Sequence, residues 1–312
     1  MRVKILGSAA GGGFPQWNCA CSNCRRLRQN NFHGQARTQA QIAVSADGNC
    51  WYLLNASPDL RFQLESTREL HPRMSPRDTP IAGVVLTSGD LDHVLGLLLL
   101  REFQPLGVYG TPSLRNILVE SNSVFRMLFS GQRGLTWSDF APGEVLELAD
   151  VGGRKSGIVV EAIPLIGSFP RYTEVSQTLD LPQAEAVIGV AMWDQDGEAR
   201  ASKRMIYAPA LAQVDDTVLS AFDSADVLLV DGTFWSEDEL CATAGRTASQ
   251  MGHAPIAGEN GLLKQLADLR APRKIFIHIN NTNPILDEDS PQYREVRAAG
   301  WEVAHDGTEF SL

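Results

Sequence analysis

The stretch Leu86-Thr87-Ser88-Gly89-Asp90-Leu91-Asp92-His93 follows an apolar run that begins at Ile81. The length of this run and its branched side chains predict a buried β-strand. Two carboxylates and an imidazole, all of them metal-binding groups, then fall in the four residues from Asp90 to His93. A rigid strand end can aim such side chains at one ion. The stretch therefore predicts a metal site at the edge of a sheet.

The overall composition indicates a globular protein. The chain has 312 residues, 44% of them hydrophobic, and shows no linker, repeat or low-complexity tract. We interpret residues 1–312 as a single domain. A net charge of −10 argues against a nucleic-acid partner, because it repels polyanions. No apolar stretch approaches the roughly 20 residues that span a bilayer, and no signal-like segment opens the chain, so we expect a cytoplasmic protein without membrane insertion.

The cysteines are unevenly placed, because three of the five lie within six residues, at Cys19, Cys21 and Cys24. In a reducing compartment, thiolates at this spacing are suited to zinc rather than to disulfides. We predict a structural zinc site here, and three incidental loop thiols are the alternative. Cys50 and Cys241 are isolated in apolar surroundings, which predicts small buried side chains.

Short apolar segments alternate with turn residues and with helix-like stretches, a pattern typical of α/β (α+β) layers. Many of the strands read as edge or meander strands rather than βαβ repeats. The predicted helices cover 94–103, 113–121, 216–225 and 260–269. The predicted strands cover 2–6, 41–45, 50–54, 81–86, 108–109, 157–163, 186–193, 203–207, 227–230, 274–279 and 302–305.

Polar groups follow several of these strands directly. Asp231 comes after the strand at 227–230, His278 lies in the strand end at 274–279, and His253 lies in a Gly-His loop before a helix. Side chains from distant strand ends can meet at one edge of a rigid sheet. These residues are therefore expected to join Asp90, Asp92 and His93 in one site.

The ordered set formed by Asp90-x-Asp92-His93, Asp231-Gly232-Thr233, Gly252-His253 and His278 resembles the metallo-β-lactamase superfamily, in the branch of RNase Z and the phosphodiesterases of phosphonate metabolism. The resemblance covers nearly the whole chain and implies a four-layer αββα sandwich. Within the branch, the segments 55–59 and 97–102 and the string His278-Ile279-Asn280-Asn281-Thr282-Asn283-Pro284-Ile285-Leu286 resemble the coenzyme PQQ synthesis protein B family.

The departures from the hydrolase pattern fall on one side of the site. Ser88 and Asp90 occupy the positions of the two histidines that help bind a first metal, and the segment 161–168 lacks the third histidine. The resemblance therefore implies a single metal, held by Asp92, His93, Asp231 and His278. Asp90 is either a further ligand or an acceptor for a metal-bound water.

Two imidazoles with one or two carboxylates are the set with which non-haem Fe(II) activates oxygen, although zinc also binds such ligands. The resemblance implies a role in making pyrroloquinoline quinone (PQQ): an iron- and oxygen-dependent hydroxylation of a Glu-Tyr crosslinked precursor from a ribosomal peptide. The alternatives are a carrier or transport-associated protein for PQQ or its precursor, and a zinc-dependent hydrolase. A homodimer is a further possibility.

His253 is expected either to act as an acid, base or substrate contact or to pack its loop. The glycine-rich turn 7–13 and the loop 167–178 are expected to border the site. Related phosphodiesterases complete the cysteine site with a histidine at the position of Asn281, a poor zinc ligand, so His33, His305 or a water is expected instead. Candidates for contacting an anionic or aromatic precursor, by residue type alone, are Arg61, Arg101, Arg126, Arg133, Arg171, Trp17, Phe169 and Tyr172.

Overall fold

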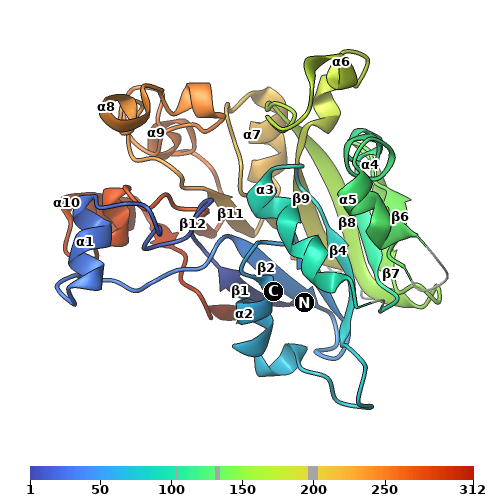
Figure 1. The fold of residues 1–312 in the computed structure, drawn as a ribbon. Helices are drawn as coiled ribbons and strands as arrows, with labels where there is room; N and C mark the ends of the chain where they lie inside the picture. Colours follow the sequence, from blue (N-terminus) through green and yellow to red (C-terminus); the bar gives the residue numbers. More distant parts are fainter. Residues whose placement is uncertain (103, 131–133, 196–202) are drawn as a thin grey trace.

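Figure 1 shows the computed structural model, which describes residues 1–102, 104–130, 134–195 and 203–312. Within these residues the strands form two seven-stranded sheets. In hydrogen-bonded order, the first sheet is β14 (Glu309–Ser311), β1 (Arg2–Gly7), β2 (Gln41–Ser45), β3 (Trp51–Leu54), β4 (Ile81–Val85), β5 (Gly107–Gly110) and β6 (Thr136–Asp139). The second is β13 (Trp301–Val303), β12 (Arg273–Ile277), β11 (Val227–Asp231), β10 (Met205–Ala208), β9 (Val187–Asp194), β8 (Lys155–Leu165) and β7 (Val145–Ala149). The two chain ends lie side by side because β1 pairs with β14 (Figure 1).

The central strands of both sheets bury both of their faces, which explains their continuous apolar sequences. In β11, Val227 and Leu229 belong to the core between the two sheets, whereas Leu228 and Val230 belong to the core on the outer face of the second sheet. Successive side chains of a strand point to opposite faces. A strand between two apolar layers must therefore be apolar at every position.

Helices cover the outer face of each sheet. Leu60, Leu114 and Phe125 from three helices pack over the first sheet, and Phe222, Leu262 and Val296 from three others pack over the second. The helices are α1 (Ser22–Arg28), α2 (Leu60–Glu65), α3 (Leu91–Val94), α4 (Pro112–Arg115), α5 (Ser123–Arg126), α6 (Val175–Thr178), α7 (Asp216–Asp223), α8 (Cys241–Ala244), α9 (Leu262–Gln265) and α10 (Pro291–Ala298). Short turns of 3₁₀ or π helix are η1 (Arg68–Leu70), η2 (Leu95–Leu100), η3 (Asn116–Glu120), η4 (Met127–Phe129), η5 (Gln183–Glu185), η6 (Ser249–Met251) and η7 (Pro284–Leu286). The predicted αββα sandwich is confirmed, and no helix in the described part of the chain is long and apolar enough to cross a membrane.

The expectation that many strands are edge or meander strands is confirmed for β1 to β3 and for β7 to β10, which pair antiparallel in sequence order, but not for the rest of each sheet. Strands β3 to β6 run parallel to one another, as do β10 to β13. The strands β6, β7 and β14 were not predicted. The helix expected over 94–103 is divided between α3 and η2, and Phe103 lies outside the described residues.

Trp301 provides a test of the core on the outer face of the second sheet. It is 1% exposed and stacks on Phe276, with ring centroids 4.2 Å apart. We expect Trp301→Ala to lower the free energy of unfolding by about 3–5 kcal/mol, because truncation leaves a cavity in this packed layer. Trp17, 86% exposed, is the matched control, and Trp17→Ala should change the value by less than about 0.5 kcal/mol. Denaturant unfolding measures both, and equal losses would contradict the assignment.

Candidate metal centre

The predicted site residues meet where strands from both sheets end. Asp231 is the last residue of β11, His278 follows β12, and the segment 90–93 follows β4 and leads into α3. Backbone hydrogen bonds link the sheets at this edge, from the Ile188 N–H to the Thr87 carbonyl (2.8 Å) and from the Ala10 N–H to the Ile279 carbonyl (2.9 Å). The site therefore rests on fixed backbone.

Asp92, His93 and His278 form the first cluster of metal-binding atoms. One ligand atom from each lies within 4.8 Å of the others. The Nε2 atom of His278 is 3.0 Å from Oδ2 of Asp92, and Nε2 of His93 is buried without a hydrogen-bond partner among the described residues. A Cβ on Gly11 would lie 3.2 Å from the Asp92 carboxylate. The absence of a side chain at Gly11 lets the glycine-rich turn approach this ligand closely.

Asp231, His253 and His278 form a second cluster, which shares His278 with the first. His253 Nδ1 lies 2.6 Å from Oδ2 of Asp231, and the rings of His253 and His278 stack at 5.4 Å. The Asp231 carboxylate also accepts the backbone N–H groups of Leu211 and Thr233, at 2.8 and 2.9 Å. In this geometry Asp231 binds His253 directly rather than lying with Asp92 and His93.

Asp90 and Ser88 lie beside the first cluster. The Ser88 hydroxyl donates to Oδ2 of Asp90 at 3.0 Å and lies 2.7 Å from Nδ1 of His93. Neither residue belongs to a cluster of metal-binding atoms in the described part of the chain. The carboxylate of Asp90 nevertheless lines the same cavity as the ligands.

Burial and neighbouring charges act in opposite directions on the pKa values of the site residues. Burial favours a neutral carboxyl group, but His93 and His278 hold the pKa of Asp92 well below its usual range. Burial also lowers the pKa of His93, which favours its neutral, metal-binding form. For His253, burial again favours the neutral ring, but the Asp231 carboxylate outweighs it and raises the pKa. The site thus combines a neutral ligand with a more basic histidine.

A cavity of about 490 Å³ opens onto these residues. Its lining comprises Asp90, Leu91, Asp92, His93, Pro170, Arg171, Tyr172, Ala210, Met251, His253 and His278. The Tyr172 hydroxyl donates to the Gly89 carbonyl at 2.7 Å, and a Cβ on Gly89 would meet Pro170 at 2.6 Å. The expectation that the loop 167–178 borders the site is thus confirmed at Pro170, Arg171 and Tyr172.

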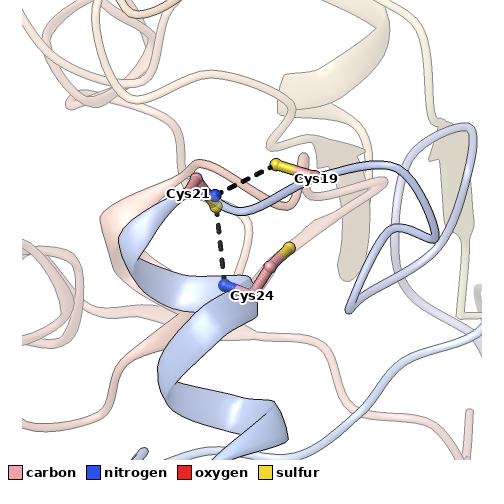
Figure 2. Close-up of side chains that lie close together, drawn as sticks. All are labelled: Cys19, Cys21 and Cys24. Atoms are coloured by element: carbon pink, nitrogen blue, oxygen red, sulfur yellow. Dashed lines mark hydrogen bonds between the residues drawn. The ribbon is translucent and has the colours of Figure 1, made fainter.

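Figure 2 shows Cys19, Cys21 and Cys24 gathered at the start of α1, and their sulfur atoms lie within 4.8 Å of one another. The Cys21 sulfur accepts the Cys24 N–H that begins the helix, and the Cys19 sulfur accepts the Cys21 N–H, both at 3.4 Å. Burial raises the pKa of the Cys24 thiol to about 11. Three sulfurs at this separation can bind one zinc ion.

Asn281 approaches all three sulfurs. Its Nδ2 atom lies 3.1, 3.6 and 3.4 Å from the sulfurs of Cys19, Cys21 and Cys24. The two histidines considered for the fourth position have other partners: His33 lies 2.9 Å from Asp289 and His305 lies 3.9 Å from Glu288. Asn281 therefore stands at the side where the fourth ligand would enter.

Sequence reasoning missed the hydroxyl groups that contact the histidines. Ser88 was considered only as a missing histidine, and Thr233 only as part of the Asp231-Gly232-Thr233 motif. Thr233 Oγ1 in fact lies 2.8 Å from Nδ1 of His278. The available signal in the sequence was a hydroxyl residue within a few positions of a predicted metal ligand. The prediction that Cys241 is buried was also wrong, because this side chain is exposed.

The model of the Beta-lactamase superfamily domain matches residues 50–279, so the chain is a member of the β-lactamase superfamily. A curated relative from Nitrosococcus oceani, Coenzyme PQQ synthesis protein B, is 42% identical over 321 residues and is aligned over 100% of both chains. Within the superfamily, the chain belongs to the coenzyme PQQ synthesis protein B family.

Solved structures agree with this assignment. A Zn²⁺-bound PqqB from Methylobacterium extorquens is 39% identical, covers 100% of both chains and superposes with a TM-score of 0.89. A diphosphatase of the PhnP family is 19% identical, covers 100% of this chain and 97% of its own, and has a TM-score of 0.66. The second likeness extends to the fold alone.

We propose that Cys19, Cys21 and Cys24 hold a structural zinc. Cys24→Ser should lower the zinc content by about one ion per chain, because only two thiolates would be left. Metal analysis of the purified proteins measures this change. Cys241→Ser, an exposed cysteine outside the cluster, should leave the zinc content at the wild-type value. Equal zinc in the wild type and Cys24→Ser would exclude this site.

Proposed function

We propose that the chain acts in PQQ biosynthesis as an iron- and oxygen-dependent hydroxylase of the Glu-Tyr crosslinked precursor. The proposed partners are this small-molecule or short-peptide precursor and molecular oxygen. The observation that carries the proposal is the cluster of Asp92, His93 and His278. Two imidazoles and one carboxylate form the ligand set of non-haem Fe(II) oxygenases. Family membership supports the pathway, and the ligand set supports the metal.

The residues present fit a metal ion. His93 Nε2 is a buried polar atom without a partner in the described residues, and such an atom is costly unless something binds it. Asp92 and His278 direct ligand atoms to the same place. Ferrous iron bound there would supply the redox chemistry needed to activate oxygen, and three protein ligands leave coordination positions open.

His253 is the residue we propose for proton transfer. Its Nδ1 atom is held by Asp231, and its ring lines the cavity beside His278. Asp231 raises the pKa of His253 against the effect of burial and so favours the protonated ring, and a histidine that lines the cavity can exchange a proton with a substrate. The stacking on His278 keeps the ring at a fixed distance from the metal ligand.

Arg171 is the residue we propose for binding the carboxylates of the precursor. Among the described residues, it is the single Lys or Arg that lines the cavity, where the other charged side chains include the acidic Asp90 and Asp92. A guanidinium pairs with a carboxylate through two parallel hydrogen bonds. The neighbouring Tyr172, bound to Gly89, fixes the loop that carries Arg171.

The two alternatives have less support. A two-metal hydrolase needs metal ligands at the positions of Ser88 and Asp90. Ser88 offers no imidazole there, and Asp90 belongs to none of the clusters of metal-binding atoms in the described residues. A carrier of PQQ or its precursor is consistent with the cavity, but does not account for the buried, unpartnered Nε2 of His93.

Anaerobic loading with Fe(II) followed by exposure to oxygen tests the hydroxylase. The reaction also contains a two-electron reductant, because one atom of O₂ enters the precursor and the other leaves as water. We expect oxygen consumption with the precursor and a product heavier by an oxygen atom, measured by an oxygen electrode and mass spectrometry. Asp92→Ala and His278→Ala should lose both bound iron and turnover, whereas His71→Ala, outside the cavity lining, should retain them. Unchanged precursor in the presence of bound iron would overturn the proposal and favour a carrier. Hydrolysis of esters by the zinc-loaded protein would favour the hydrolase.

Arg171→Ala tests the substrate-binding side of the proposal. Loss of a charged hydrogen bond is expected to raise KM for the precursor about tenfold to a hundredfold and to leave kcat nearly unchanged. Arg171→Lys should recover part of the loss because it retains the charge. The matched control is Arg61→Ala, in an exposed position of α2 outside the cavity lining. A KM equal to the wild-type value in Arg171→Ala would rule out this contact.

A further inference from the structure

Two hydroxyl groups each lie between a carboxylate and a site histidine. Ser88 connects Asp90 with His93, and Thr233 connects Asp231 with His278. We propose that Ser88 and Thr233 are positioning residues that hold both histidines in the tautomer with the proton on Nδ1, so that Nε2 is available to a metal. The proposal rests on the metal site of the proposed function, but not on hydroxylation.

The geometry around Ser88 determines which atom donates. A hydroxyl has one hydrogen and two acceptor positions. The Ser88 hydrogen points to Oδ2 of Asp90 (3.0 Å), since an ionised carboxylate only accepts, and the oxygen accepts the Asp90 N–H (3.2 Å). With the hydrogen on the charged acceptor, the second acceptor position of the oxygen is left for Nδ1 of His93 at 2.7 Å, and the proposal therefore assigns the proton to Nδ1, which also lies 3.4 Å from the Thr87 hydroxyl. Its proton on Nδ1 leaves a lone pair on Nε2, the buried atom without a partner among the described residues.

The contacts of Thr233 repeat this arrangement in the other sheet. Its Oγ1 atom lies 2.5 Å from Oδ1 of Asp231, 2.9 Å from the His278 carbonyl and 2.8 Å from Nδ1 of His278. A weaker contact joins it to Nδ1 of His253 at 3.2 Å, an atom that lies closer to Asp231, at 2.6 Å. The shorter contact and the negative charge direct the single hydrogen to Asp231. His278 Nδ1 then donates to Thr233.

The proposed tautomers leave the Nε2 atoms of His93 and His278 free to bind a metal. With its proton on Nδ1, His278 places the lone pair of Nε2 3.0 Å from the Asp92 carboxylate. Two acceptors at this distance repel each other unless a cation lies between them. His93 Nε2 belongs to the same cluster. Two parallel chains of carboxylate, hydroxyl and imidazole thus aim two ring nitrogens at one cation, as second-sphere hydrogen bonds do in metal sites.

Nitrogen-15 NMR of the histidine rings tests the inference directly. In the metal-free wild type, we expect His93 to carry its proton on Nδ1 with Nε2 unprotonated. On titration with zinc, the Nε2 signals of His93 and His278 should shift while both Nδ1 atoms keep their protons. Because the ring signals report this site alone, zinc bound by the cysteines does not interfere. A wild-type His93 with its proton on Nε2, or a zinc-bound His278 without a proton on Nδ1, would overturn the proposal.

Variants that lack one hydroxyl test whether Ser88 and Thr233 position the histidines or only support the fold. Ser88→Ala should disturb the tautomer of His93 alone, and Thr233→Val that of His278 with His93 unchanged. Each variant should weaken zinc binding at the ring nitrogens about tenfold to a hundredfold. Ser88→Thr and Thr233→Ser should restore both properties, with His71 as the unaffected internal control. Folded variants that keep the wild-type tautomers and zinc affinity would refute the role, whereas failed hydroxylation with intact tautomers would count only against the proposed function.

Discussion

The buried carboxylate of Asp231 is the constraint on which the rest of the site depends. A carboxylate has about four acceptor positions. In Asp231 they are used by the Thr233 N–H and hydroxyl on one oxygen, and by the Leu211 N–H and His253 Nδ1 on the other. An ionised group removed from water needs such complete pairing. Through these bonds Asp231 fixes the turn after β11, the segment after β10 and the loop of His253. Direct metal binding by Asp231 would require one of these partners to leave, and His253 is the partner that is not attached to neighbouring strands.

His278 connects the two halves of the site. Its Nδ1 side faces Thr233 and thereby Asp231, and its Nε2 side faces Asp92. The ring of His278 therefore connects the fully hydrogen-bonded Asp231, through Thr233, with the first cluster. The backbone at His278 has a φ of +59°, in the left-handed region that residues other than glycine seldom adopt. Such strain persists where surrounding contacts determine the conformation, and the Thr233 hydroxyl does so here, next to both Nδ1 and the carbonyl of His278.

Much of the fold and of the ligand set could be predicted from the sequence, because both depend on local patterns. β4, β11 and β12 read as apolar runs since each is buried on both faces, and their ends carry Asp92, Asp231 and His278. In contrast, β6 and β7 are sheet edges with exposed positions at Thr136 and Val145, so they carry no apolar pattern. Arg171 could not be told from Arg61 by residue type, because only the fold places one of them at the cavity. The cysteine spacing predicted the sulfur cluster, but its contact with Asn281 joins residues about 260 positions apart.

Ser88 replaces a histidine of the hydrolase motif, and this replacement does more than remove a metal ligand. In related hydrolases an imidazole at this position donates a lone pair to a first metal. The hydroxyl of Ser88 instead donates to Asp90 and, in the proposed tautomer, accepts from Nδ1 of His93. A hydroxyl oxygen can donate one hydrogen bond and accept another at the same atom. A nitrogen of a neutral imidazole ring can only donate or only accept, so a histidine at position 88 could not serve both partners through one atom. The same substitution that removes a ligand of the first metal position therefore supplies the group that orients a ligand of the second. In the proposed site, Ser88 would thus take part both in the absence of a first metal and in the orientation of a ligand for the second.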